Sequence, residues 1–247
     1  MLVITKHPER WKHLDPKMND VISDFFEYAG ADRIAEEQHQ QSFRSTYGTE
    51  SGPVIVMGMG PSRLELKGRK VKYPIMAINR AILDFPEAKY WCAQDRESIQ
   101  DCLPKLKELG ATPALVTYAC HFRTDWWKNA DWLKKIFIEI FPDPRRHARR
   151  PLYWNQTTVG WTWDLAIRMG FSKIYCIGIG TSTRSYVNPH YSHEYMDAQH
   201  ACVRDRLVEM FLPSQIGGWN EKGVPLVDLA FDGYLPIEKG SVNDVCE

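Results

Sequence analysis

The sequence predicts an α/β/α sandwich in which helices cover both faces of a mostly parallel sheet. After Gly52, short apolar runs alternate with longer amphipathic stretches, which is the pattern of successive strand–helix–strand units. The short runs are apolar throughout, as expected for strands that are buried on both faces. Together these observations indicate an open α/β sheet built from strand–helix–strand units.

The elements of this fold follow one another along the chain. The strands are expected, in order, at Val54–Met57, Ile75–Ile78, Tyr90–Ala93, Ala114–Tyr118, Lys173–Ile179 and, last, Pro225–Leu229. Amphipathic spacing predicts the helices at Arg96–Leu109, Asp125–Phe141, Thr158–Met169 and His193–Phe211. The clearest strand is the run KIYCIGI, which starts at Lys173.

The first 50 residues differ in character from the rest. A short amphipathic helix is expected at Asn19–Gly30, and residues 31–50 are polar and rich in Gln, Glu, Ser and Thr. We therefore expect residues 1–50 to form an N-terminal extension, helical in places and packed loosely on a domain formed by residues 51–247.

Composition excludes several classes of protein. The chain is 44% hydrophobic and 25% charged with a formal net charge of zero, which argues against a protein that coats nucleic acid through many phosphate contacts. No stretch approaches the roughly 18 apolar residues that span a bilayer, and no signal peptide is recognisable, so a cytoplasmic protein without a membrane span is expected. The six cysteines form no CxxC pair, and we expect buried free thiols, with Cys92 and Cys176 inside strands; a catalytic or metal-binding cysteine is the alternative.

Ligands of open α/β sheets bind outside the carboxyl ends of the strands, so the residues that follow each strand are the candidates for a site. The first such segment is VIVMGMGPSR. Its glycine loop, Gly58–Gly60, follows a strand, and Pro61 after it suits the first turn of a helix. A helix start after glycines can hold an anion. The dinucleotide fingerprint fails, because Arg63 replaces the third glycine and Asn79 stands near the expected acidic position. A phosphate or nucleotide loop of another type and a tight turn without a ligand both remain.

A series of motifs resembles a known family. The series runs from GMGPS through AIN, which ends at Asn79, and YWCAQD, which ends at Asp95, to NQTTVGWTWDLAIRMGFSKIYCIGIG and GVPLVDLAFDGYLP. In order and spacing these motifs resemble the bacterial and phage group that joins sialyltransferase-like proteins with 6-hydroxymethylpterin diphosphokinase-like proteins. The resemblance covers roughly residues 53–236.

The resemblance implies a nucleotide-binding Rossmann-like domain. In the sialyltransferase-like branch the donor is a CMP-sugar and no metal is needed, whereas the pterin branch uses a Mg-nucleoside triphosphate. The implied donor-binding residues are Gly58, Gly60, Pro61, Ser62, Asn79, Thr157, Thr158 and Gly160.

The chain departs from the family pattern at two positions. Thr157 stands where the sialyltransferase-like enzymes have an Arg, and the strong strand ends in Gly178-Ile179-Gly180 instead of Gly-x-Asp. The lost carboxylate is consistent with altered substrate chemistry or with loss of activity.

A polar segment, GTSTRSYVNPHYSH, follows the strong strand and is long enough to fold over a ligand. Gly180, Thr181 and Ser182 are expected to contact the donor. Transfer to an alcohol needs a base, and histidine suits this role near its ordinary pKa, so His193 is the first candidate and His190 the second; a plain surface-loop role remains for each. Further candidates for binding the acceptor in this segment are Arg184, Tyr186 and Tyr191.

Two further patterns are less specific. His193, Asp197 and His200 share a helical spacing that would suit a metal, but a solvated helix face gives the same pattern, so no metal site is predicted. No Asp-x-Asp pair occurs, which favours a metal-independent mechanism.

The stretch of residues 125–150 contains three tryptophans and four arginines. It could bind the acceptor, with Trp126, Arg145 and Arg146 as the candidates, because tryptophan stacks on sugars or bases and arginine binds phosphate or carboxylate. Alternatively, it is core packing followed by a basic loop.

The leading hypothesis is a transferase that uses a nucleotide-activated small-molecule donor, most simply a metal-independent glycosyltransferase of the sialyltransferase-like type. The acceptor is a glycan, a nucleotide or a modified nucleic acid. The first alternative is a Mg-ATP-dependent diphosphokinase of the pterin type, with Asp95 as a metal ligand. The second is a nucleotide-binding protein without enzymatic activity.

Overall fold

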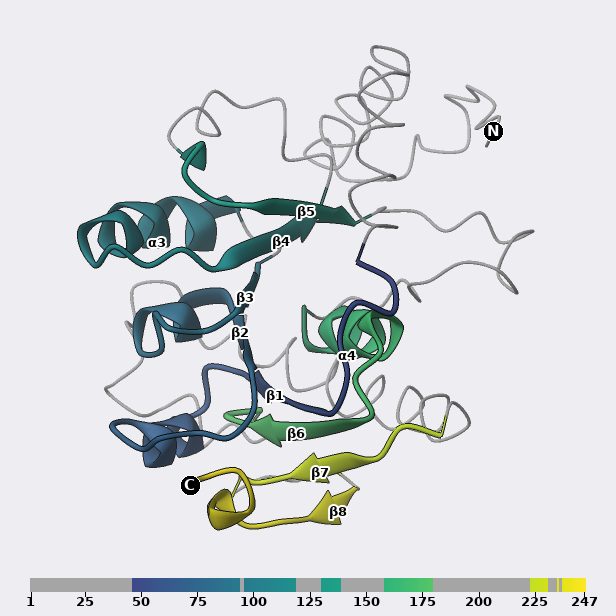
Figure 1. The fold of residues 1–247 in the computed structure, drawn as a ribbon. Coiled ribbons are helices and arrows are strands. Elements are labelled where there is room, and N and C mark those ends of the chain that lie inside the picture. Colours follow the sequence, from purple (N-terminus) through teal and green to yellow (C-terminus); the bar gives the residue numbers. More distant parts are fainter. Residues whose placement is uncertain are drawn as a thin grey trace, which may run out of the picture.

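The described residues form one parallel sheet with helices on both faces (Figure 1). The computed structural model describes residues 46–93, 96–118, 130–138, 158–179, 223–230, 235 and 237–247. Within these ranges the eight-stranded sheet has the order β5-β4-β3-β2-β1-β6-β7-β8, and every pairing is parallel. The strands are β1 (Pro53–Met57), β2 (Ile75–Ile78), β3 (Tyr90–Cys92), β4 (Ala114–Tyr118), β5 (Lys135–Ile138), β6 (Lys173–Ile177), β7 (Leu226–Asp228) and β8 (Glu238–Lys239).

The strand order reverses between β1 and β6. From β1 the chain adds β2 to β5 in one direction and then returns to pair β6 with the opposite side of β1, with Val56 opposite Cys176. Such a reversal leaves a crevice outside the carboxyl ends of the two strands, because the loops that follow them diverge to opposite faces. The glycine loop and Gly178 lie at this point.

Each face of the sheet has its own apolar core. One core joins Ile55 and Met57 of β1 to α3 (Arg96–Glu108) and to the 3-10 helices η2 (Pro61–Leu66) and η3 (Asn79–Leu83). The other joins Val54 and Val56 to α4 (Thr158–Met169). Figure 1 shows α3 and α4 on opposite sides of the sheet. The predicted α/β/α sandwich is therefore confirmed.

The helix predicted at Asp125–Phe141 is wrong over its described part. Residues 135–138 form β5, which pairs in parallel with β4 and places Val116 opposite Ile136. The sequence KIFI is rich in β-branched and aromatic residues, which favour a strand beside an apolar neighbour. The described part of the predicted helix therefore contributes a strand at the edge of the sheet.

The other described elements agree with the prediction to within a few residues, apart from the carboxyl end of the chain. Pro225–Leu229 is not the last strand, because the two-residue strand β8 follows it and pairs with β7. A further 3-10 helix, η8 (Val242–Asp244), starts with a capping box formed by Ser241 and Asp244. The helices predicted at Asn19–Gly30 and His193–Phe211 lie outside the described residues.

The direction of α4 relative to the sheet decides which of its ends faces the candidate site. Its last carbonyls, those of Arg168 and Met169, accept hydrogen bonds from the N–H groups of Gly48 and Glu50, just before the amino end of β1. A helix of 12 residues is about 18 Å long, so the other end of α4 lies toward the carboxyl ends of the strands. The start of α4 thus lies at the carboxyl ends of the strands, as the glycine loop does.

The described cysteines, Cys92, Cys102, Cys176 and Cys246, are buried and free. Burial raises the pKa of the Cys92 thiol to about 12, so this thiol stays protonated and unreactive at neutral pH. The prediction of buried free thiols is confirmed for these residues. Among the described helices, none has the length and apolar character to cross a bilayer.

Candidate functional site

The glycine loop is locked against the end of β6 by backbone contacts. The N–H of Gly58 donates to the carbonyl of Ile177 at 2.8 Å, and the N–H of Gly60 donates to the carbonyl of Gly178 at 2.6 Å. A Cβ atom on Gly58 would lie 2.4 Å from the Gly178 oxygen, and one on Gly60 would lie 2.7 Å from it. Both glycines are therefore required by the close approach of two chain segments, whatever ligand the loop holds.

Gly178 and Ser62 complete this junction. Gly178 has a φ of +65°, in the left-handed region that favours glycine, and its N–H donates to Ser62 Oγ at 3.0 Å. Ser62 is 1% exposed, so its hydroxyl oxygen is already engaged inside the protein. The expected helix after Pro61 is the six-residue 3-10 helix η2, which is too short to contribute much of a helix dipole.

The Arg63 side chain contacts both the glycine loop and Asp84. Its side chain is 9% exposed, and its guanidinium donates to the backbone carbonyls of Met59 and Gly60, the latter at 3.1 Å. The same group pairs with Asp84, with Nε at 2.9 Å and Nη2 at 2.5 Å from Oδ2. The residue that breaks the dinucleotide fingerprint thus connects the glycine loop to Asp84, the residue that ends η3.

Asn79 follows β2, the strand beside β1, and carries two signs of a functional position. Its φ of +51° lies in the left-handed region, which is uncommon for a residue other than glycine. Its Oδ1 is buried, and no described residue donates a hydrogen bond to it. Its backbone carbonyl accepts a hydrogen bond from Trp91 Nε1 at 2.8 Å, which fixes the turn. A buried acceptor without a donor is costly, so a ligand that donates a hydrogen bond would stabilise this arrangement.

The start of α4 adds a positively polarised helix end to the same edge of the sheet. Thr158 is the first residue of α4, Gly160 is buried in its first turn, and that turn contains no acidic residue. The hydroxyl of Thr162 donates to the carbonyl of Thr158 at 2.7 Å. Contacts with β1 and β2 place α4 over the strands that carry the glycine loop and Asn79. The positive end of a helix dipole favours a phosphate or carboxylate nearby.

The structure thus brings six of the predicted donor-binding positions to one edge of the sheet: Gly58, Gly60, Ser62, Asn79, Thr158 and Gly160. Pro61 opens η2 at the same edge. The remaining candidates lie outside the described residues, namely Asp95, Trp126, Arg145, Arg146, Thr157, Gly180, Thr181, Ser182, Arg184, Tyr186, His190, Tyr191 and His193.

Sequence analysis missed two groups near this edge. Asp84 gives no local signal, since its partner Arg63 is 21 residues away and the pairing appears only in the fold. Asp228 ends β7 with its side chain fully buried; its Oδ1 accepts from the N–H of Ala230 at 2.9 Å, and its Oδ2 pairs with Lys239. An acidic residue that ends a buried strand is the signal that would have singled out Asp228.

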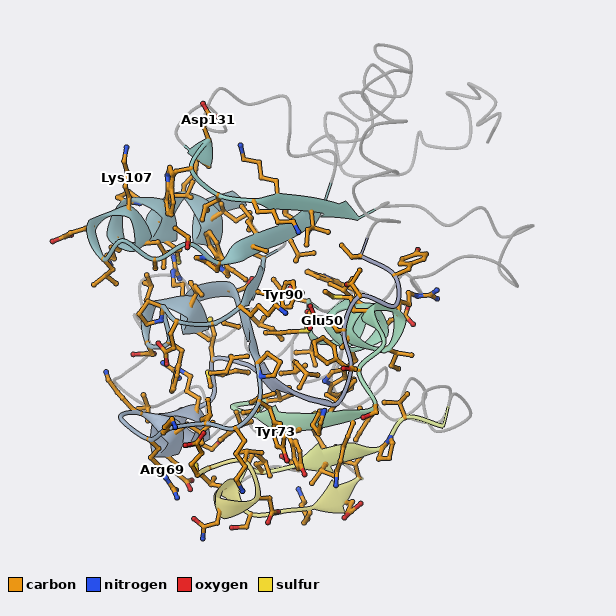
Figure 2. All side chains as sticks on the ribbon, viewed as in Figure 1. Glu50, Arg69, Tyr73, Tyr90, Lys107 and Asp131 are labelled. Carbon is orange, nitrogen blue, oxygen red and sulfur yellow. The ribbon has the colours of Figure 1, made fainter. Side chains whose placement is uncertain are left out.

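A second polar cluster lies at the opposite edge, beside the end of α4 (Figure 2). Glu50 Oε1 accepts hydrogen bonds from Tyr90 OH and Lys89 Nζ, both at 2.6 Å. Burial opposes ionisation of Glu50, but the hydrogen bonds from Lys89 and Tyr90 outweigh it, so the pKa of Glu50 lies below its ordinary value. Burial, reinforced by the bond to Glu50, raises the pKa of Tyr90. The polar groups of this cluster are paired with one another.

Comparisons with known proteins find similar solved structures, among them two from Campylobacter jejuni. An alpha-2,3-sialyltransferase in apo form is 14% identical over 79% of this chain and 82% of that chain, with a TM-score of 0.41. The sialyltransferase CstII, in complex with the substrate analogue CMP-3FNeuAc, is 15% identical over 76% of this chain and 85% of that chain, with a TM-score of 0.43. No protein-family model and no curated protein sequence matches the chain. Both structural similarities are weak, so the function proposed next depends on this chain's own residues.

Proposed function

We propose that the protein is a transferase that binds a nucleotide-activated donor at the carboxyl ends of β1, β2 and β6. The observation that carries this proposal is the convergence of three features at the strand-order reversal. These are the locked glycine loop, the left-handed Asn79 with its unpartnered Oδ1, and the start of α4. Ligands of open α/β sheets bind at such a reversal.

Each feature suits one part of a nucleotide. A ribose hydroxyl or a base amino group donates hydrogen bonds, and either would satisfy Asn79 Oδ1. The start of α4 suits the donor phosphate, because its first turn contains no acidic residue that would repel an anion. The glycine loop, packed against Gly178, fixes the carboxyl end of β1 beside the proposed nucleotide position.

We propose sugar transfer as the reaction, on the resemblance of the sequence motifs to the sialyltransferase-like group. In this reaction the bond between the sugar and the donor phosphate breaks, and the acceptor oxygen forms the new bond to the sugar. His193, with His190 as the second candidate, would take the proton from the acceptor hydroxyl. The hydroxyls at 181–182 would hold the donor, and Arg184, Tyr186 and Tyr191 would face the acceptor.

Donor binding is tested by thermal denaturation with CMP-, UDP- and GDP-sugars and with ATP, each with and without Mg²⁺. A nucleotide-sugar that raises the melting temperature without metal supports the proposal. Stabilisation by Mg-ATP alone would instead indicate the diphosphokinase reaction, and no response to any nucleotide would end the proposal of a nucleotide site.

The role of His193 is tested separately. His193→Ala should abolish transfer while the melting-temperature shift with the donor persists, because a general base is needed for the reaction and not for binding the donor. His190→Ala tests the second candidate in the same way: loss of transfer in this variant alone would assign the proton transfer to His190. Full transfer activity in the His193 variant would remove this histidine from the mechanism.

A further inference from the structure

We propose that Arg63, clamped by Asp84, is a positioning residue that sets the distance between the glycine loop and the Asn79 turn. Here the glycine loop is Gly58–Gly60 and the Asn79 turn is η3. The inference rests on the proposed nucleotide site, because both segments are assigned to that site.

The contacts of Arg63 join the two segments directly. On one side its Nη1 donates to the carbonyls of Met59 and Gly60, which belong to the glycine loop. On the other side its Nε and Nη2 donate to Oδ2 of Asp84, the residue that caps the end of η3. One guanidinium thus connects the segment that follows β1 with the segment that follows β2.

Arginine is specifically suited to this position. Its planar guanidinium presents several N–H donors at fixed angles, so it can bind two carbonyls and a carboxylate at once, and it stays charged at any working pH. A lysine ammonium is a single compact donor on a flexible stem and cannot reproduce this geometry. Lys67 also approaches Asp84, at 3.7 Å, but it is 62% exposed, which makes it a weaker partner.

The need for such a clamp follows from the topology. Hydrogen bonds within the sheet fix the spacing of β1 and β2 only as far as Met57 and Ala77, the last paired residues. Beyond Met57 and Ala77, the pairing of β1 with β2 no longer holds the glycine loop and the Asn79 turn at a fixed distance. The glycine loop is tied to β6 through Gly178, and Arg63 supplies a tie toward the Asn79 side. The width of the crevice for a nucleotide would then depend on Arg63.

A role in stability alone predicts a different outcome from a positioning role. If Arg63 only stabilises the fold, its loss lowers the melting temperature and leaves the affinity of folded protein for nucleotide unchanged. If Arg63 positions Asn79 against the loop, the loss of affinity depends on Asn79 being present. A double-mutant cycle between the two residues separates these roles, because coupled residues do not contribute additively.

The experiment measures the affinity of CMP, UDP, GDP and ATP by calorimetry, at a temperature where each variant is folded. For the nucleotide that binds wild type most tightly, Arg63→Gln should weaken binding about tenfold, and the same change in an Asn79→Ala background should weaken it much less. Arg63→Lys should restore only part of the affinity. Lys67→Gln is the matched control, since it removes a charge beside Asp84 without touching the loop, and it should bind as wild type does.

The outcomes separate this proposal from the one on which it rests. Wild type that binds none of the nucleotides overturns both proposals. Wild type that binds, with Arg63→Gln binding equally well or with losses that simply multiply in the double variant, overturns the positioning role and leaves the nucleotide site standing. If Arg63→Gln does not fold, Arg63→Lys and Asp84→Asn carry the same test, and wild-type affinity in both would overturn the role.

Discussion

Two partly buried polar side chains, one at each end of the strands, differ in how they are satisfied: Glu50 is paired at the amino end (the amino edge), whereas Asn79 Oδ1 at the carboxyl end (the carboxyl edge) has no donor among the described residues. At the amino edge, Glu50 accepts hydrogen bonds from Lys89 and Tyr90, and its backbone N–H binds the end of α4. At the carboxyl edge, Asn79 has a left-handed backbone and a buried Oδ1 that no described residue satisfies. Strained and unsatisfied groups persist where function requires them. The comparison indicates that the amino ends of the strands contribute to stability, and it supports our proposal that a ligand binds at their carboxyl ends.

The largest expected effect tests the interlocked glycines. Gly58→Ala should destabilise the protein by at least about 3 kcal/mol, because the added Cβ would lie 2.4 Å from the Gly178 oxygen and one backbone segment would have to move. Chemical denaturation measures this loss. In the matched control Gly110→Ala, no neighbour lies within 4 Å of the new Cβ, and the positive φ alone should cost about 1 kcal/mol. Equal losses in the two variants would contradict the close packing of the loop.

The next effect separates stability from binding at Asn79. Asn79→Gly should be at least as stable as wild type, since glycine tolerates a φ of +51° and removes the unsatisfied Oδ1, yet nucleotide binding should fall about tenfold. Asn79→Ala should lose the same binding and also about 1 kcal/mol of stability relative to the glycine variant. Denaturation and calorimetry on both variants measure the two quantities. Undiminished binding in both would place the ligand elsewhere.

A smaller effect concerns the amino edge. The pKa of Glu50 in the folded protein lies below its ordinary value of 4.5, so its ion pair stabilises the fold above that pH and the contribution disappears as the pH falls through the folded pKa. Glu50→Gln should therefore be about 1 kcal/mol less stable than wild type at pH 7, with the difference shrinking in acid. Nucleotide affinity should not change. A difference that stays constant to low pH would show that the charge of Glu50 contributes nothing.

The smallest effect is expected at an exposed ion pair. Lys70 pairs with Glu247, and the two side chains are 78% and 48% exposed. Lys70→Met should change the free energy of unfolding by no more than about 0.5 kcal/mol, because water already solvates both charges. A loss similar to that of Glu50→Gln would show that the C-terminal segment depends on this pair.

Sequence reasoning predicted the elements whose signal is local. The apolar runs at β1, β2 and β4 and the amphipathic spacing of α4 predicted these elements closely. The prediction failed at β5, where residues 135–138 follow several tryptophans and lysines whose spacing also suits a helix. This segment forms a strand because it pairs with the edge of β4 that β3 does not occupy. A pattern along the sequence does not show which strand a segment pairs with.

The candidate site shows the same limit. The loop glycines and Asn79 were predicted from their place after strands, since the rule about carboxyl ends needs only the strand assignment. The sequence also showed Arg63 in place of a third glycine, which removed the dinucleotide fingerprint. It did not show that Arg63 reaches Asp84, or that Gly58 and Gly60 are required by Gly178, because these contacts join residues far apart in the chain.

The pairing of Val56 with Cys176 has a consequence for the order of folding during synthesis. Strands β1 to β5 can associate as they leave the ribosome, but β1 then remains an unpaired edge until β6 has been made. At about 5 to 20 residues per second, this wait lasts on the order of ten seconds. An apolar edge strand exposed for that time is prone to pair with other chains. The central position of β1 therefore predicts that the nascent chain is most prone to aggregate before β6 has been made.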